Sequence, residues 1–181
     1  MTLKYSLTEN DYLQHLLFSA TQSDRIKKKR RRNWIRTTGV FFCVGLIFYF
    51  SKETHMVYYC LVIGLITLIF YPSYERYQYK KHYKKWVAEN YKGRINVIST
   101  VVLTENTIET YDKTGEAKLN VSELQDIVET NEYFYLKLKI GESLIIPKLK
   151  VEDVDGLRFQ LQDLAARLKI NFETDLTWEW K

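Results

Sequence analysis

Two apolar runs dominate the middle of the chain. They cover residues 37–50 and 56–71, comprise 30 residues and contain no charged side chain. Neither run has a polar face at helical spacing, and a helix that is apolar all round lies either in a large core or in a membrane. Because 181 residues cannot build a core that surrounds two such helices, we expect residues 34–71 to form a transmembrane helical hairpin. The connection at 51–55 is short enough to make the two helices antiparallel.

The runs are short for membrane spans. Sixteen residues rise about 24 Å in a helix, against a hydrocarbon thickness of about 30 Å. Trp34, Arg36 and the tyrosines that flank the runs are suited to interfacial positions that absorb this shortfall. A soluble or re-entrant helical hairpin is the alternative that the length leaves open.

The segments on either side of the hairpin have helical patterns. In residues 1–33, a short strand is expected at 4–7, and Thr8 followed by Asp11 is typical of a helix start. The helix that follows has one apolar side, made by Tyr12, Leu13, Leu16, Leu17 and Ala20. After Pro72, bases and aromatic residues interleave over 72–93, which predicts a juxtamembrane helix that ends near Gly93.

From residue 94 the pattern changes to period two. Strands are predicted at 97–103, 107–111, 117–121, 133–140 and 143–146, with Leu124, Ile127 and Val128 just before the fourth of them. In that fourth strand one face has Phe134, Leu136, Leu138 and Ile140, and the other has Tyr133, Tyr135, Lys137 and Lys139. A final amphipathic helix starts at a cap on Asp153 or Glu152 and buries Val154, Leu157, Leu161, Leu164, Ala165 and Leu168. Residues 94–169 are therefore predicted to form a small α+β domain whose helix covers a curved sheet or plugs a partly open barrel.

The tail, residues 170–181, alternates apolar and acidic positions like a strand. It either adds an edge strand to its own domain or docks on a partner by strand addition. The candidate partner-binding residues are Phe172, Glu173, Asp175, Leu176, Trp178, Glu179 and Trp180.

Charge is unevenly distributed along the chain. The net charge of +5 and the aromatic content of 15% exclude a disordered chain. The net charge of residues 1–36 is +6, that of residues 72–94 is +5, and that of residues 95–181 is −6. Basic charge beside apolar spans indicates an anchor on anionic phospholipid rather than a nucleic-acid site, and it predicts that both termini are cytoplasmic. The residues of this basic-aromatic anchor are Lys27, Lys28, Lys29, Arg30, Arg31, Arg32, Trp34, Arg36, Arg76, Lys80, Lys81, Lys84, Lys85 and Trp86.

No motif in the chain carries catalytic chemistry. There is no GxSxG, HExxH, P-loop or GxGxxG sequence. Cys43 and Cys60 lie inside the apolar runs without a CxxC pattern, and the three histidines are far apart in the sequence. We therefore expect no catalytic residue, metal or cofactor.

The order of these parts resembles the YcxB-like family of small bacterial membrane proteins. The resemblance is carried by Val102-Leu103-Thr104-Glu105-Asn106-Thr107-Ile108, by Tyr133-Phe134-Tyr135-Leu136 and by Ile145-Ile146-Pro147-Lys148. It implies a C-terminal domain similar to bacterial pleckstrin-homology-like folds, on the cytoplasmic side of the bacterial plasma membrane, and it implies no catalytic residue. The Trp-rich end, residues 172–181, departs from the family and suggests a partner of its own.

These observations favour a binding module held at the membrane. The expected partners are anionic lipid at the basic flanks and a protein of unknown identity, and a homo-oligomer is compatible with the sequence. One alternative is a membrane-resident immunity protein that neutralises a toxin. Another is an enzyme that acts on lipid or envelope precursors, which would need convergent polar side chains in one pocket.

Overall fold

The structure is a computed structural model that describes residues 1–113 and 115–180. It contains two compact units. The sheet unit comprises residues 1–15 and 86–179, and the helical unit comprises residues 16–85 together with Trp180.

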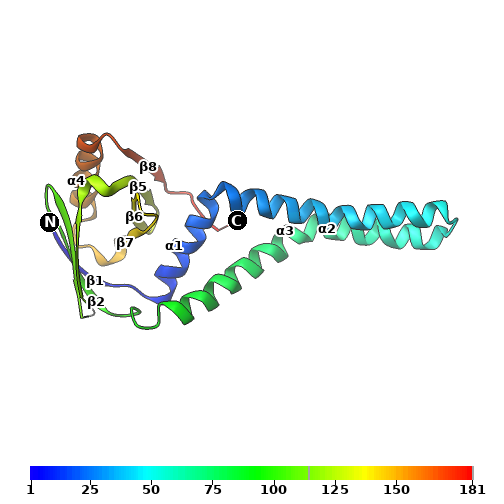
Figure 1. Ribbon diagram of the computed structural model, residues 1–181, viewed down its shortest axis with the longest axis horizontal. Coiled ribbons are helices and arrows are strands. Elements are labelled where there is room, and N and C mark those ends of the chain that lie inside the picture. Colours follow the sequence, from blue (N-terminus) through cyan, green and yellow to red (C-terminus); the bar gives the residue numbers. More distant parts are fainter. Residues whose placement is uncertain (114, 181) are drawn as a thin grey trace. The chain divides into compact units, whose positions relative to one another are not determined.

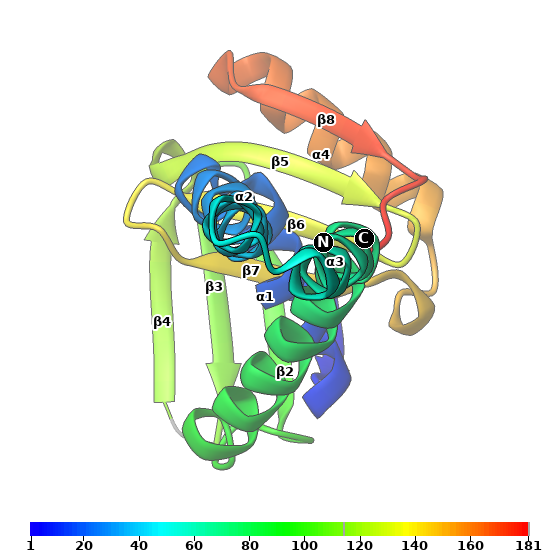
Figure 2. The same ribbon diagram turned by 90° about the vertical axis from the view of Figure 1, so that its right-hand side faces the viewer.

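Two four-stranded sheets form the sheet unit. The first is antiparallel and has the order β1 (Thr2–Ser6), β2 (Ile98–Leu103), β3 (Thr107–Asp112) and β4 (Gly115–Asn120). The second has the order β7 (Ser143–Pro147), β6 (Tyr133–Leu138), β5 (Leu124–Thr130) and β8 (Asn171–Asp175), with β8 parallel to β5. In Figure 2 the strands β3 and β4 run vertically and β5 and β8 run across them, so the strands of one sheet cross those of the other.

The core lies between the two sheets and helix α4 (Val154–Leu168). The predicted core face of β6 is confirmed at Phe134, Leu136 and Leu138, all of which are buried. Asp153 begins α4 as expected, because its side chain accepts a hydrogen bond from the backbone N–H of Gly156 at 2.8 Å. The predicted apolar face of α4 is buried in the core, which places the helix over the sheets.

The first strand of the first sheet is separated from its partner strand in the sequence by the three helices. β1 pairs with β2 along its whole length, from Thr2 opposite Val102 to Ser6 opposite Ile98. The backbone N–H of Asn96 also donates to the carbonyl of Leu7 at 2.8 Å. The sheet unit is thus discontinuous in sequence, and it includes part of the 1–33 segment that the sequence pattern separates from the 94–169 domain.

Three helices lie between β1 and β2 in the sequence. They are α1 (Glu9–Gln22), α2 (Asp24–Phe50) and α3 (Thr54–Asn90), and Figure 1 shows α2 and α3 side by side as a hairpin. By length and composition α2 and α3 are both able to cross a membrane. In the apolar 18-residue stretch of each helix, only 11% (α2) and 6% (α3) is buried. Phe50 is 81% exposed and Ile69 is 66% exposed. Such apolar exposure is not that of a core helix in a soluble protein.

Pro72 lies inside α3, so the predicted boundary between residues 71 and 72 falls within one continuous helix. Proline has no N–H, and the carbonyl of Leu68, four residues earlier, therefore lacks its helical donor. The indole N–H of Trp34 donates to that carbonyl from α2 at 3.1 Å. A side chain of the neighbouring helix thus replaces the hydrogen bond that the proline removes.

Two local predictions differ from the structure. Ile140, expected on the core face of β6, is 66% exposed because β6 ends at Leu138 and Gly141 turns the chain with a φ of 88°. The tail forms the strand β8, as its alternation predicts, but β8 ends at Asp175 although the alternation continues to Trp180. β8 occupies the edge of its own sheet beside β5.

Candidate membrane-surface site

The register of the helical hairpin brings the two basic stretches together. Gly45 faces Cys60, with 3.3 Å between an ideal Cβ on the glycine and the Cys60 Cβ, and Gly64 faces Phe41 at 3.5 Å. Toward the other end, Arg30 Nε of α2 lies 3.4 Å from Glu75 Oε2 of α3. The bases of 25–36 therefore lie beside those of 76–85.

Most of the predicted anchor residues lie on the surface. Arg30 and Trp34 are half-buried between the helices, and the other twelve are exposed. Trp86 belongs to the sheet unit, where its ring meets that of Tyr91 at 5.4 Å. Residues 24–36 and 72–85 together contain thirteen Lys and Arg against two acids, Asp24 and Glu75. This end of the hairpin is thus strongly positive, and it directly adjoins the exposed apolar surface of both helices.

A cavity of about 850 Å³ opens between α2 and α3 at this basic end. One wall comes from α2, and the other comes from a stripe of α3 at the spacing of three to four residues that shares a helix face. The lining residues are Ser23, Arg25, Ile26, Lys29, Asn33, Tyr71, Tyr74, Glu75, Gln78, Tyr79, His82 and Tyr83. The cavity thus has cations on its α2 side and mainly tyrosines on its α3 side.

Glu75 is the buried acid of this cavity, with only 8% of its surface exposed. Its Oε2 accepts from the guanidinium of Arg30, whereas its buried Oε1 has no hydrogen-bond partner among the described residues. Arg30 is shared, because its guanidinium also lies 5.2 Å from the ring of Trp180 and 5.8 Å from that of Tyr79. Sequence reasoning missed Glu75, although it is the one acid among residues 54–88.

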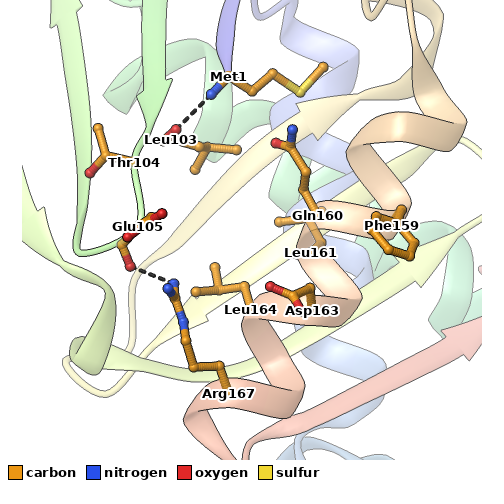
Figure 3. A pocket seen from close by; sticks show the side chains of 10 residues that line it. All are labelled: Met1, Leu103, Thr104, Glu105, Phe159, Gln160, Leu161, Asp163, Leu164 and Arg167. Atoms are coloured by element: carbon orange, nitrogen blue, oxygen red, sulfur yellow. Dashed lines mark hydrogen bonds between the residues drawn. The ribbon is translucent and has the colours of Figure 1, made fainter.

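A second cavity, of about 480 Å³, lies in the sheet unit between α4 and the turn from β2 to β3 (Figure 3). Its ionisable groups include Glu105, Asp163 and Arg167. The guanidinium of Arg167 donates to the carbonyl of Glu105, and the ammonium of Met1 donates to the carbonyl of Leu103 at 2.7 Å. These groups join α4 and the N-terminal strand to the β2–β3 turn. Across residues 1–113 and 115–180, no group of three His, Cys, Asp or Glu side chains could hold a metal ion.

The start of α1 docks on the outer face of the second sheet through Asp11. This carboxylate accepts from the Tyr133 hydroxyl at 2.9 Å, from the Thr8 backbone N–H at 2.7 Å and from Lys150 Nζ at 3.2 Å. Burial opposes ionisation of Asp11, but these donors outweigh it and lower the pKa of the carboxyl group. The predicted cap at Thr8 is confirmed, and the same Asp11 carboxylate that accepts from Thr8 also accepts from Tyr133 of the sheet.

His15, one turn further along α1, lies over the same sheet face. Its ring is 5.4 Å from that of Tyr135, which is itself fully buried. Burial, together with the charge of Lys137, lowers the pKa of His15 to about 4. The tyrosine face of β6 is therefore covered by protein, a fact that the alternation of β6 alone does not reveal.

The candidate partner-binding tail divides among three roles. Phe172 packs against the core of the sheet unit. Trp180 belongs to the helical unit, where its indole N–H donates to the carbonyl of Arg76 at 3.3 Å and its ring lies 6.4 Å from that of Tyr79. Asp175 and Trp178 are half-buried, and Glu173, Leu176 and Glu179 are exposed. The seven residues therefore do not form one exposed face.

Comparison with models of known protein families found no match, and neither the curated proteins nor the solved structures contain one.

Proposed function

We propose that this protein is a membrane-anchored interaction module. In this proposal α2 and α3 cross a bacterial plasma membrane as a hairpin, and the sheet unit is a pleckstrin-homology-like domain on the cytoplasmic side. Two sheets whose strands cross, followed by a C-terminal helix in the order β1 to β7 then α4, support that fold assignment. The same order supports membership of the YcxB-like family.

The observation that carries the proposal is the register of the hairpin. It gathers thirteen bases at one end, beside two helices whose apolar side chains are exposed. Each base near an anionic lipid surface contributes on the order of 1 kcal/mol to binding. Exposed apolar helices need lipid around them, and the basic end is the part suited to the anionic cytoplasmic headgroups.

The pairing of β1 with β2 supports the same-side arrangement of the two ends. β1 precedes the hairpin and β2 follows it, yet they form one ladder. Strands on opposite sides of a bilayer cannot pair, so the chain between them crosses an even number of times. Two crossings by α2 and α3 satisfy this condition.

The sheet unit is the part that we propose binds a protein partner. Residues 95–181 sum to −6, so anionic lipid repels this part of the chain and leaves lipid contact to the basic anchor. Within the tail, Glu173, Leu176 and Glu179 remain exposed for such a partner. The proposed role is binding, without catalysis.

Cysteine labelling in intact spheroplasts tests the topology. In a background with Cys43→Ala and Cys60→Ala, a single cysteine is placed either in the hairpin turn (Lys52→Cys) or on the sheet unit (Lys113→Cys). A maleimide that cannot cross membranes should label the turn cysteine in spheroplasts and the sheet cysteine only after lysis. Labelling of both in intact spheroplasts, or recovery of the protein in the soluble fraction, contradicts the proposal.

A further inference from the structure

We propose that the cavity between α2 and α3 binds the headgroup of a phospholipid that carries a primary ammonium, as phosphatidylethanolamine does. The inference rests on the proposed membrane position of the hairpin and names a specific ligand for its basic end. It differs from the anchor because the anchor attracts any anionic lipid, whereas this cavity selects a headgroup with both charges.

The carboxylate of Glu75 is buried, and one of its two oxygens lacks a hydrogen-bond donor among the described residues. One of its oxygens accepts from Arg30 at 3.4 Å, and the other is buried with no hydrogen-bond partner among the described residues. An acceptor left in this state costs free energy unless a ligand or a water satisfies it. A primary ammonium has three N–H donors and the opposite charge, whereas the quaternary ammonium of choline has no N–H.

Tyrosines surround Glu75 on the same wall. Tyr71, Tyr74, Tyr79 and Tyr83 line the cavity at helical spacing along α3. Aromatic faces attract cations, and tyrosine is among the favoured rings for this contact. The α3 wall is therefore suited to the ammonium of a headgroup.

The opposite wall is suited to a phosphate. Arg25 and Lys29 of α2 line the cavity one turn apart, and Asn33 continues the same stripe. Arginine and lysine are the usual phosphate ligands in proteins. A zwitterionic headgroup placed across the cavity meets a cationic wall with its phosphate and the acidic, aromatic wall with its ammonium.

The position of the cavity points to a lipid rather than a soluble ligand. The cavity is lined by Asn33, which directly precedes the apolar segment 34–71, and by Tyr71, which ends it. In that segment Ile69 and Phe70 are 66% and 63% exposed. These exposed side chains provide a surface for acyl chains next to the headgroup. The volume of about 850 Å³ is within the range of ligand pockets.

The test measures which lipids stay with the full-length protein. The protein is reconstituted into vesicles of equimolar phosphatidylethanolamine, phosphatidylcholine and phosphatidylglycerol, re-extracted in mild detergent and analysed for retained lipid by mass spectrometry. We expect phosphatidylethanolamine to be enriched about tenfold over phosphatidylcholine, the ratio that one charge-assisted hydrogen bond supplies. Glu75→Gln should abolish the enrichment, and Tyr83→Leu, which leaves the carboxylate in place, should reduce it.

The matched control is Glu53→Gln, because Glu53 is an exposed acid in the hairpin turn outside the cavity. It should retain lipid as the unaltered protein does, and helix content by circular dichroism should be equal in all variants. Equal retention of phosphatidylethanolamine and phosphatidylcholine, or unchanged enrichment in Glu75→Gln, overturns the inference. Competition by free glycerophosphoethanolamine at the same concentration as the lipid overturns the lipid as ligand.

Preferential retention of phosphatidylglycerol also overturns the headgroup site, while leaving the proposed anchor intact. Flotation of the vesicles gives the separate measurement on the proposed function. If the protein does not float with the vesicles, the proposed membrane anchor is wrong, whatever lipid preference is measured.

Discussion

Glu129 shows how a buried charge holds two elements of the sheet unit together. It lies on β5 with 2% of its side chain exposed, and it accepts from Arg158 Nε of α4 at 2.9 Å and from Lys148 Nζ at 2.6 Å. Burial opposes ionisation, but the two cations outweigh it and lower the pKa of Glu129. Its contribution to stability is therefore present at neutral pH and declines as the pH falls below the ordinary carboxyl value toward the folded pKa.

We expect Glu129→Gln to destabilise the sheet unit by about 3 kcal/mol, because it leaves Arg158 and Lys148 without their buried counter-charge. The measurement is chemical unfolding of the full-length protein in detergent. Asp155→Asn is the control, since Asp155 pairs with the same Arg158 but is 89% exposed, and it should cost less than about 0.5 kcal/mol. Equal costs for the two variants would show that the buried position contributes nothing.

A second prediction at this scale concerns His15. Its pKa falls from 6.5 to about 4 on folding, so the unfolded chain takes up a proton first as the pH drops. Stability should therefore decline between pH 6.5 and 4, by at most about 3 kcal/mol. Asp11 and Glu129 also titrate in acid, so the quantity to compare is the difference between the unaltered protein and His15→Gln. A difference that does not change across this pH range contradicts the burial of His15.

At the scale of elements, the contact between Trp34 and Leu68 compensates for Pro72. Trp34→Phe should destabilise the hairpin by about 1–2 kcal/mol, because the carbonyl of Leu68 then has no donor. Pro72→Ala restores a backbone N–H for that carbonyl, so Trp34→Phe should cost less in the Pro72→Ala background. A double-mutant cycle of unfolding in detergent, followed by helical circular dichroism, measures the coupling. Additive effects would mean that the two residues act independently.

The elements themselves were largely predictable, because their signals are local. Period-two alternation and turn residues predicted β2, β3 and β4, and the cap at Asp153 predicted the start of α4. What could not be predicted depends on partners distant in sequence: the burial of Tyr135 needs α1 above it, and the acid Glu129 needs Arg158 from α4. The tail shows the converse, since its alternation continues past Asp175 but β5 ends at Thr130 and offers no further pairing.

The candidate site divides in the same way. Composition and charge predicted the basic-aromatic anchor, because a dense run of bases beside an apolar span is visible in the sequence. The cavity and the role of Glu75 emerge only when the register of α2 against α3 is known. The available signal was a single acid, Glu75, in a basic and aromatic segment. Its role can be inferred only once the hairpin places Arg30 of α2 beside it.

At the scale of the whole molecule, two strands that pair in one sheet, β1 and β2, are separated in the sequence by all three helices of the hairpin region. β1 closes the first sheet from the N-terminal side of the hairpin, and Leu3 on β1 is 6% exposed within the common core. The domain can therefore be complete only after both hairpin helices have been synthesised and β1 has met β2. Long-range pairing of this kind is slow, because the intervening loop must be closed before any contact forms.

This arrangement makes a prediction about residues that lie far from the domain in sequence. Leu3→Ala should destabilise the sheet unit by about 3 kcal/mol through the cavity it leaves, as a substitution in β5 or β6 would. Lys4→Ala is the control on the same strand, since Lys4 is exposed. Hydrogen exchange of the full-length protein should show lost protection in β2 and β3 for Leu3→Ala alone. If protection in those strands is unchanged, β1 is dispensable, and the argument that its pairing holds both ends of the hairpin on one side of the membrane loses its support.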